Sequence, residues 1–234
     1  MVVRRRRDIR VQLAFLHAFV HGHSNMNLLV FGATGPTGQQ VVKQALGQGH
    51  TVTAFVRNRA TQPIGDKRLR VVNGDTTRDT PKIIEAVSGQ NVVISVLGRQ
   101  SAFKSDHLVE RSMQAIVPAM ERAGVRRLIL VSAFGVGESR RDAPLILRVM
   151  YRVLLNDIFA DKKAAEDNVR RSNLDWTFVY PVLLTDGPMT GAYRVGDRLE
   201  LHGLPKISRA DVAHFILTEV GKRAFVRKVA VISY

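Results

Sequence analysis

Three glycines, each three residues after the last, are the first feature of this sequence that could support chemistry. Gly32, Gly35 and Gly38 follow an apolar run that ends at Phe31, and an apolar helical pattern begins at Pro36. At such a strand-to-helix junction the first glycine permits a sharp turn, the second a close approach to a pyrophosphate, and the third close packing of the helix. Free amides and the positive end of the helix dipole would then face the phosphates. The spacing predicts a dinucleotide-binding turn.

Basic residues after the next apolar run bear on which dinucleotide would bind. Arg57 and Arg59 follow the run that ends at Val56, and no acidic residue occurs between Gly32 and Gly65. An acidic residue here would bind the ribose 2′-hydroxyl of NAD, whereas an arginine binds the 2′-phosphate of NADP. We therefore expect NADP(H) to be preferred over NAD(H). If the two arginines are ordinary loop charges, the protein would accept both cofactors.

Two further polar side chains are expected at the carboxyl ends of strands, where open α/β sheets bind their ligands. Asp75 follows the run at 70–73, and it could accept a hydrogen bond from an adenine amino group or cap the next turn. Ser132 follows the apolar run at 127–131. Gly98 closes the run at 91–98, where a cofactor would pass.

Alternating strands and helices are needed to bring these residues to one edge. Strands are expected at 28–31, 51–56, 70–73, 91–98, 127–131, 175–180 and 228–232. Helices are expected at 36–48, 80–88, 105–123 and 208–220, the last capped by Ser208, and in a mainly helical stretch at 139–172 with a break near 156–160. A turn-rich loop at 183–188 and short β pieces at 193–201 complete the pattern. The alternation predicts an α/β fold, a doubly wound parallel sheet with a small C-terminal portion on the substrate side. In a nucleotide-free protein of this class the glycine turn would be structural only.

Composition excludes several kinds of site. The 234-residue chain has no cysteine, which excludes disulfides, thiol catalysis and cysteine-ligated metals. Its net charge of +15, from 35 Lys and Arg against 20 Asp and Glu, admits an anionic ligand, a nucleic acid or an acidic membrane surface as partner. The basic residues are scattered without interleaved aromatics, so we expect mostly solvated charges and no specific nucleic-acid partner.

The first 26 residues differ from the pattern that follows. Arginines at 4–7 precede a ten-residue apolar run at 11–20, which is too short to cross a bilayer. We interpret residues 1–26 as an N-terminal extension, disordered or not native, with an Arg-rich mitochondrial presequence as the alternative. His17, His21 and His23 lack acidic neighbours, so no metal site is expected. Residues 27–234 are expected to form a single NAD(P)-binding domain in the cytoplasm, or in mitochondria if a presequence is present.

Several segments together resemble the atypical short-chain dehydrogenase/reductase superfamily, in particular its NAD(P)H-binding group with biliverdin reductase B (flavin reductase) and NmrA-like proteins. The matching segments are 31–38 (FGATGPTG), 56–58 (VRN), 74–75 (GD), 131–134 (VSAF), 185–188 (TDGP) and 190–193 (TGAY). The resemblance spans about residues 27–220 and implies a Rossmann fold that binds NADP(H). It implies pyrophosphate contacts from Gly32, Thr34, Gly35, Thr37 and Gly38, a 2′-phosphate contact from Arg57, an adenine contact from Asp75, ribose contacts from Leu97 and Gly98, and nicotinamide contacts from Ser132, Pro181, Val182 and Leu183.

One departure from the wider superfamily concerns the proton. Ordinary members use a tyrosine with a lysine four residues later, and the lysine lowers the pKa of the phenol. None of the tyrosines, Tyr151, Tyr180, Tyr193 and Tyr234, has a lysine at that spacing. The usual proton relay is therefore missing.

Two functions remain open on these observations. The first is an NADPH-dependent reductase of a conjugated acceptor such as a flavin (FMN), a quinone or a tetrapyrrole, whose reduced form takes its proton from water, with Ser132 as a hydrogen-bonding catalytic residue. The second is a non-catalytic NADP(H)-binding redox sensor of the NmrA-like type. Lys162, Lys163 and Glu166 share one helical face and are the next polar candidates, although as surface residues they would need no function.

Overall fold

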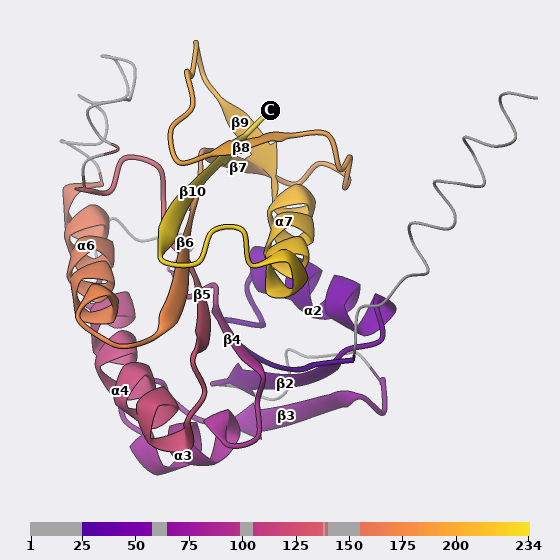
Figure 1. Cartoon of the computed structure of the whole chain (residues 1–234), viewed down its shortest axis with the longest axis vertical. Helices are drawn as coiled ribbons and strands as arrows, with labels where there is room; N and C mark the ends of the chain where they lie inside the picture. The colour runs from indigo at the N-terminus through magenta and orange to yellow at the C-terminus, as the bar shows by residue number, and fades with distance from the viewer. Residues whose placement is uncertain (1–24, 58–64, 99–104, 138, 140–154) are drawn as a thin grey trace, which may run out of the picture.

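A mostly parallel sheet forms the centre of the computed structural model, which describes residues 25–57, 65–98, 105–137, 139 and 155–234 (Figure 1). Its strand order is β3 (Leu69–Asn73), β2 (Thr51–Val56), β1 (Asn27–Phe31), β4 (Val92–Ser95), β5 (Arg127–Val131), β6 (Asp175–Pro181), β10 (Lys228–Ser233) and β8 (Arg194–Gly196). All neighbours pair in parallel except β10 and β8. A separate pair is formed by β7 (Leu183–Thr185) and β9 (Lys206–Ser208).

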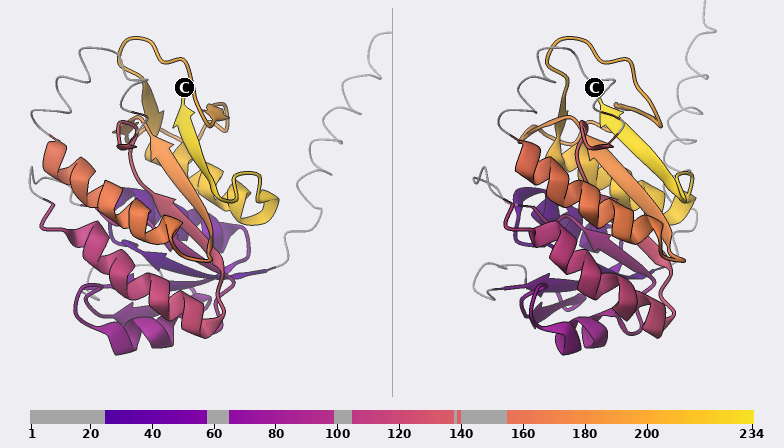
Figure 2. Two further views of the ribbon diagram at one scale, coloured as in Figure 1. Left: turned by 60° about the vertical axis from the view of Figure 1, so that its left-hand side comes forward. Right: turned by 90° about the vertical axis from the view of Figure 1, so that its left-hand side faces the viewer.

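Helices cover both faces of this sheet (Figure 2). On one face α3 (Thr80–Val87) packs against α4 (Leu108–Ala123), and α4 packs against α6 (Asn156–Arg170). On the other face α2 (Pro36–Gly47) packs against α7 (Arg209–Lys222). This is the doubly wound α/β fold that the sequence predicts. Within the described part of the chain, no helix combines the length and the apolar character that a membrane crossing requires.

The central strands are apolar on both of their faces. In β1 the four residues from Leu28 to Phe31 are fully buried, as parallel strands between two helical layers should be. Strands β2 and β3 extend from one side of β1, and β4, β5 and β6 extend from the other. The carboxyl ends of β1 and β4 therefore flank the point where the strand order reverses, which is where open α/β sheets bind their ligands.

Three local predictions need correction. The strand expected at 91–98 ends at Ser95, so that residues 96–98 lie beyond the sheet. The break expected near 156–160 is wrong, because these residues begin α6: Asp157 suits the positive end of a helix dipole and Phe159 is buried. The loop expected at 183–188 contains β7. The predicted cap is confirmed, since Ser208 Oγ accepts a hydrogen bond from the backbone N–H of Asp211.

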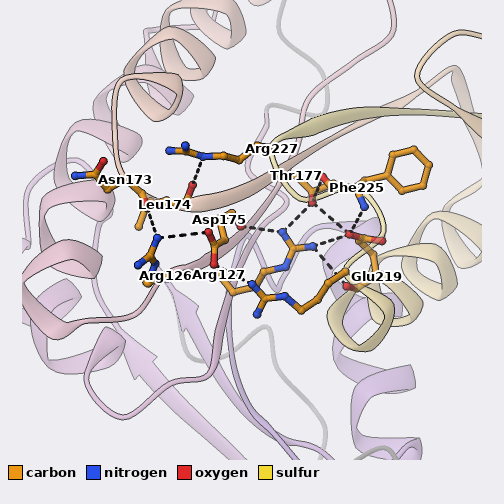
Figure 3. A network of polar contacts seen from close by, with 10 residues as sticks. Arg126, Arg127, Asn173, Leu174, Asp175, Thr177, Glu219, Phe225 and Arg227 are labelled. Atoms are coloured by element: carbon orange, nitrogen blue, oxygen red, sulfur yellow. Dashed lines mark hydrogen bonds and ion pairs between the residues drawn. The ribbon is translucent and has the colours of Figure 1, made fainter.

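A polar network crosses the amino ends of β5 and β6 (Figure 3). Arg127 and Glu219 form an ion pair of 2.9 Å, and their side chains are 3% and 2% exposed. Arg127 also donates to the carbonyl of Asp175 and to Thr177 Oγ1, both at 2.8 Å, while Glu219 accepts from the backbone N–H of Phe225. Burial lowers the pKa of Arg127 to about 10, which leaves it charged at neutral pH. The network ties α7 to the sheet at the edge opposite the glycine turn.

Candidate functional site

The glycine turn is built where β1 ends beside β4. Val96 donates its backbone N–H to the carbonyl of Phe31 over 3.0 Å, which holds the two strand ends together. Gly32 has a φ of +81°, and a Cβ there would lie 2.8 Å from the carbonyl oxygen of Val96. A Cβ on Gly38 would overlap the carbonyl oxygen of Gly32. Both positions therefore require glycine, one for the turn and one for the close approach of α2.

The first turn of α2 offers unpartnered amides. Gly35 caps the helix without a side-chain hydrogen bond, and its own N–H is used by the carbonyl of Gly32 at 3.1 Å. Pro36 has no N–H, and the amides of Thr37 and Gly38 have no acceptor among the described residues. Thr34 lies in the same turn, where its carbonyl accepts from Gln39 Nε2. Free amides at the positive end of a helix fit a pyrophosphate group.

Arg57 and Asp75 come together at the adjoining strand ends. Gly74 donates its N–H to the carbonyl of Val56 over 2.9 Å, which aligns the residues that follow β2 and β3. Asp75 Oδ1 accepts from both the N–H (2.8 Å) and the hydroxyl (2.7 Å) of Thr77. These bonds lower the pKa of Asp75, with smaller effects from nearby arginines that include Arg57. The turn-capping alternative for Asp75 is thus realised, while its adenine role stays a prediction and Oδ2 accepts no bond from the described residues.

The remaining predicted contacts follow β4, β5 and β6. Leu97 and Gly98 lie directly after β4, half-buried and exposed respectively. The segments after β5 and β6 run together, because Ser132 donates its N–H to the carbonyl of Val179 (2.8 Å) and Phe134 to that of Pro181 (3.0 Å).

Ser132 and the end of β6 differ in exposure. Ser132 is buried, and its hydroxyl has no hydrogen-bond partner within the described part of the chain. Val182 is also buried, whereas the side chain of Leu183 is 61% exposed. The carboxyl edge of the sheet therefore carries all the residues for which contacts with adenine, pyrophosphate and nicotinamide are predicted. Arg59, Tyr151 and the first 24 residues lie outside the described residues.

A polar cluster on α6 lies beside Ser132, and spacing alone did not resolve it. Glu166 is 1% exposed and accepts a hydrogen bond of 2.6 Å from the phenol of Tyr180. Lys162 donates to the carbonyl of Val131 at 3.3 Å, and desolvation lowers its pKa. Lys163 differs, because it is exposed and pairs with Asp167 at 2.6 Å. The surface interpretation is therefore wrong for Glu166, incomplete for Lys162, and right for Lys163.

The sequence around Tyr180 offers no lysine four residues later and so gives this tyrosine no role. Its place in an apolar strand gave a signal that it would be buried, but not which helix it would face. No group of three or more His, Asp or Glu side chains suited to a metal occurs among the described residues. The site can therefore offer amides to phosphates, a cation beside β2, and a buried hydroxyl, carboxyl and phenol beside β5 and β6.

Several known proteins are similar to this chain in sequence or fold. An uncharacterized chloroplastic protein of Arabidopsis thaliana is 29% identical over 174 residues, which cover 70% of this chain but only 61% of that protein. ChuY from Escherichia coli O157:H7, named an anaerobilin reductase, is 25% identical with a TM-score of 0.73, covering 88% of this chain and 96% of its own.

A cofactor complex is among the similar structures. A short-chain dehydrogenase/reductase from Veillonella parvula in complex with NADP is 22% identical, covers 90% of this chain and 95% of its own, and has a TM-score of 0.76, which supports the fold. The profile of the NAD(P)H-binding family matches residues 32–222, from the glycine turn to the end of α7. The chain belongs to the NAD(P)H-binding family.

Proposed function

We propose that this protein is an NADPH-dependent reductase that delivers a hydride to a conjugated acceptor, with a tetrapyrrole as the favoured class over a flavin or a quinone. When bound, the nicotinamide supplies the hydride. The observation that carries the proposal is the pair of unpartnered amides, Thr37 and Gly38, at the positive end of α2. They meet the requirement of a pyrophosphate and lie next to the strand-order reversal.

The preference for NADPH rests on Arg57. Its side chain is exposed directly after β2, where the adenine ribose of a bound dinucleotide would lie, and no acidic residue precedes it in the turn. A guanidinium can hold a phosphate through two parallel hydrogen bonds. Asp75 stands near Arg57 and keeps Oδ2 available, which suits an adenine amino group without opposing the phosphate contact.

The acceptor class rests on apolar surface beside the predicted nicotinamide position. Leu183 and Leu204 are 61% and 69% exposed, and Leu183 donates its N–H to the carbonyl of Pro205, so the two leucines lie on adjoining segments. Exposed leucines next to a site can contact the flat face of a large conjugated ring. The similarity to a protein named anaerobilin reductase supports a tetrapyrrole, and the net charge of +15 favours an anionic one.

The function can be tested by following the nicotinamide absorbance of the purified protein with NADPH or NADH and, in turn, a bilin, FMN and a quinone. We expect NADPH oxidation to be fastest with the bilin, and slower with NADH than with NADPH. Ser132→Ala should lower the rate. Lys163→Ala is the matched surface control, since it removes only an exposed ion pair with Asp167, and it should leave the rate unchanged.

The same experiment separates the reductase from a sensor. Calorimetry with NADPH in the absence of acceptor measures binding alone. Tight binding of NADPH with no oxidation across all three acceptor classes would replace the reductase with a non-catalytic NADP(H)-binding protein. If neither nucleotide gave a heat of binding, both the reductase and the NADP(H)-binding sensor would be ruled out.

A further inference from the structure

A buried polar cluster lies where the predicted nicotinamide end of the site meets α6. Tyr180 donates a hydrogen bond to Glu166 Oε2 over 2.6 Å, and both residues are buried. Burial, and then its hydrogen-bonded partner Glu166, raise the pKa of Tyr180, so the phenol keeps its proton. One carboxyl oxygen of Glu166 is therefore occupied as an acceptor.

The second carboxyl oxygen lies near an unpartnered hydroxyl. Glu166 Oε1 and Ser132 Oγ are both buried, and neither makes a hydrogen bond with any described residue. Lys162, one turn before Glu166 on α6, donates to the carbonyl of Val131, the residue before Ser132. Ser132 in turn donates its N–H to the carbonyl of Val179, which precedes Tyr180, the partner of Glu166. The two side chains therefore lie in one neighbourhood, and the Ser132 hydroxyl lowers the pKa of Glu166. Buried polar atoms without partners are rare in folded proteins, and a small movement of either side chain would let these two share a hydrogen bond.

Ser132 connects this cluster to the cofactor edge. Its backbone follows β5 and is bonded to β6, so its position is set by two central strands rather than by a loop alone. A hydroxyl can accept a proton from one neighbour while donating its own to another. Ser132 thus stands between a buried carboxyl and the edge of the sheet at which an acceptor would bind.

We propose that Glu166 supplies, through the hydroxyl of Ser132, the proton that the acceptor takes up when it is reduced. This inference rests on the proposed reductase function. It assigns to Glu166 the part that the missing tyrosine and lysine pair plays elsewhere in the superfamily, and it replaces the expectation that water alone provides the proton. Glu166 does not contact the acceptor itself and acts only through Ser132.

The step balances as a reduction by two electrons and two hydrogens. The acceptor gains a hydride at carbon from NADPH, which becomes NADP⁺, and the acceptor is left with an extra negative charge. The O–H bond of Ser132 then breaks as its proton moves to the acceptor heteroatom, and Ser132 Oγ takes the proton from Glu166 Oε1. Glu166 is left as a carboxylate, and it recovers a proton from solvent before the next turnover.

The charges around Glu166 set the direction of its pH dependence. Burial raises the pKa of Glu166, while the hydroxyls of Ser132 and Tyr180 and the cations Arg170 and Lys162 lower it, and the net effect is a raised pKa. The carboxyl therefore holds its proton to a higher pH than it would in water. Proton transfer from Glu166 should be available below this pKa and decline as the pH rises through it.

The first test is the pH profile of kcat at saturating NADPH and acceptor. In the wild-type protein we expect kcat to fall as the pH rises through the pKa of Glu166. Glu166→Gln keeps the size and the acceptor for Tyr180 but cannot give up a proton. We expect kcat about 100- to 10,000-fold lower on the acid side, with the fall removed. Asp167→Asn, on the exposed side of the same helix, should retain the wild-type rate and profile.

The second test needs no turnover. Carboxyl carbon NMR of the ligand-free protein, labelled at glutamate, should show one carboxyl that titrates above the ordinary range and disappears in Glu166→Gln. Ser132→Ala should raise the pKa of that carboxyl further, because it removes a hydroxyl that lowers it. An unchanged titration in Ser132→Ala would mean that the two side chains are not coupled, and it would overturn the proposal even if Glu166→Gln failed to fold.

The outcomes separate this inference from the function on which it rests. A wild-type protein that oxidises NADPH, with a Glu166→Gln variant that keeps the wild-type pH profile, would overturn the proton route and leave the reductase standing. A wild-type protein that binds NADPH but oxidises none with any acceptor would overturn the reductase, and the proton route with it.

Discussion

Arg57 and Glu166 show how single side chains acquire different roles from their surroundings. Arg57 is exposed at the end of β2, where a charged group can meet a ligand without losing much hydration. Glu166 is buried on α6 among hydroxyls and cations, where a carboxyl holds its proton more strongly. One of these residues is suited to binding, and the other to carrying a proton.

Replacing Arg57 by alanine should discriminate between the two nicotinamide cofactors. The variant loses hydrogen bonds to a doubly charged phosphate, and such bonds contribute about 1.5–3 kcal/mol. We expect the Kd for NADPH to rise about 10- to 100-fold and the Kd for NADH to change by less than about twofold. Calorimetry with both nucleotides measures this. Equal losses for NADPH and NADH would show that Arg57 does not contact the 2′-phosphate.

At the scale of elements, the turn between β1 and α2 depends on the absence of side chains. The helix approaches the turn so closely that a Cβ on Gly38 would overlap the carbonyl oxygen of Gly32, and that oxygen belongs to backbone which cannot move aside cheaply. The same helix ends at Gly47, where an added Cβ would meet nothing within 4 Å. The two glycines of α2 therefore form a matched pair for mutation.

Gly38→Ala should weaken both stability and nucleotide binding. Overpacking of this kind costs about 1–3 kcal/mol, and the turn must shift to relieve it, which displaces the free amides. Gly47→Ala should be neutral or stabilise by up to about 1 kcal/mol, because alanine favours the helix. Urea unfolding and NADPH titration of both variants check this. A Gly38→Ala protein with unchanged NADPH affinity would contradict the placement of the pyrophosphate.

The hydrogen bonds of Asp211 join α7 to the segments around it. The buried Asp211 accepts hydrogen bonds from the backbone N–H groups of Thr190 and Gly191 and from the hydroxyls of Thr190, Ser208 and Tyr234. Burial alone would raise the pKa of Asp211, but these donors outweigh it and the pKa is lowered. One carboxylate thus fastens the 190–191 segment and the last residue to the start of α7.

The hydrogen bonds of Asp211 make part of the stability depend on pH. Because the folded-state pKa is lowered, this contribution is present above the unfolded value near 3.9 and is lost as the pH falls through the folded value. Tyr234→Phe removes a 2.7 Å bond to Asp211 Oδ2 and should cost about 1.5–3 kcal/mol at pH 7. Urea unfolding from pH 7 down to about 3 should show a smaller acid-induced loss for Tyr234→Phe than for wild type. An equal acid-induced loss of stability in Tyr234→Phe and wild type would show that the Tyr234 bond does not lower the pKa of Asp211.

At the scale of the whole molecule, the two edges of the sheet have different tasks. The carboxyl edge carries the glycine turn, Arg57 and Ser132, and it contains buried atoms without partners. The amino edge carries the Arg127–Glu219 pair, whose bonds join β5, β6 and α7 (Figure 3). The ion pair at the amino edge therefore stabilises the fold that positions the residues at the carboxyl edge.

Glu219→Ala should destabilise the whole molecule without altering the cofactor site directly. It leaves the buried Arg127 charge without its partner, which costs about 3–5 kcal/mol. Glu85→Ala is the control, because Glu85 pairs with Arg70 on the surface and such pairs contribute less than about 1 kcal/mol. Chemical unfolding at neutral pH measures both variants. If Glu219→Ala lowered the free energy of unfolding as little as Glu85→Ala, the buried Arg127–Glu219 pair would not stabilise the protein.

Local patterns predicted most of the fold, because each pattern is decided by neighbours in the chain. The glycine spacing, the apolar runs of parallel strands and the Ser208 cap depend on a few consecutive residues, and the structure confirms these elements. The errors occurred where a local signal is ambiguous: Asn156 and Asp157 can break a helix or begin one, and here they begin α6. The cofactor contacts of Arg57 and the glycine turn stay predictions, which NADPH titration of the Arg57→Ala and Gly38→Ala variants tests.

The doubly wound sheet and the glycine turn could be predicted from the sequence alone, because strand periodicity and turn chemistry depend on residues close together in the chain. The matching segments also indicated the family. The environment of Glu166, by contrast, could be seen only in the folded chain. Lys162, Lys163 and Glu166 are indistinguishable by helical spacing, and what separates them is the packing of α6 against β6, which places Tyr180 on Glu166 and leaves Lys163 in solvent. Burial depends on contacts between distant segments, and for that reason a proton-carrying carboxyl could be recognised only once the chain was folded.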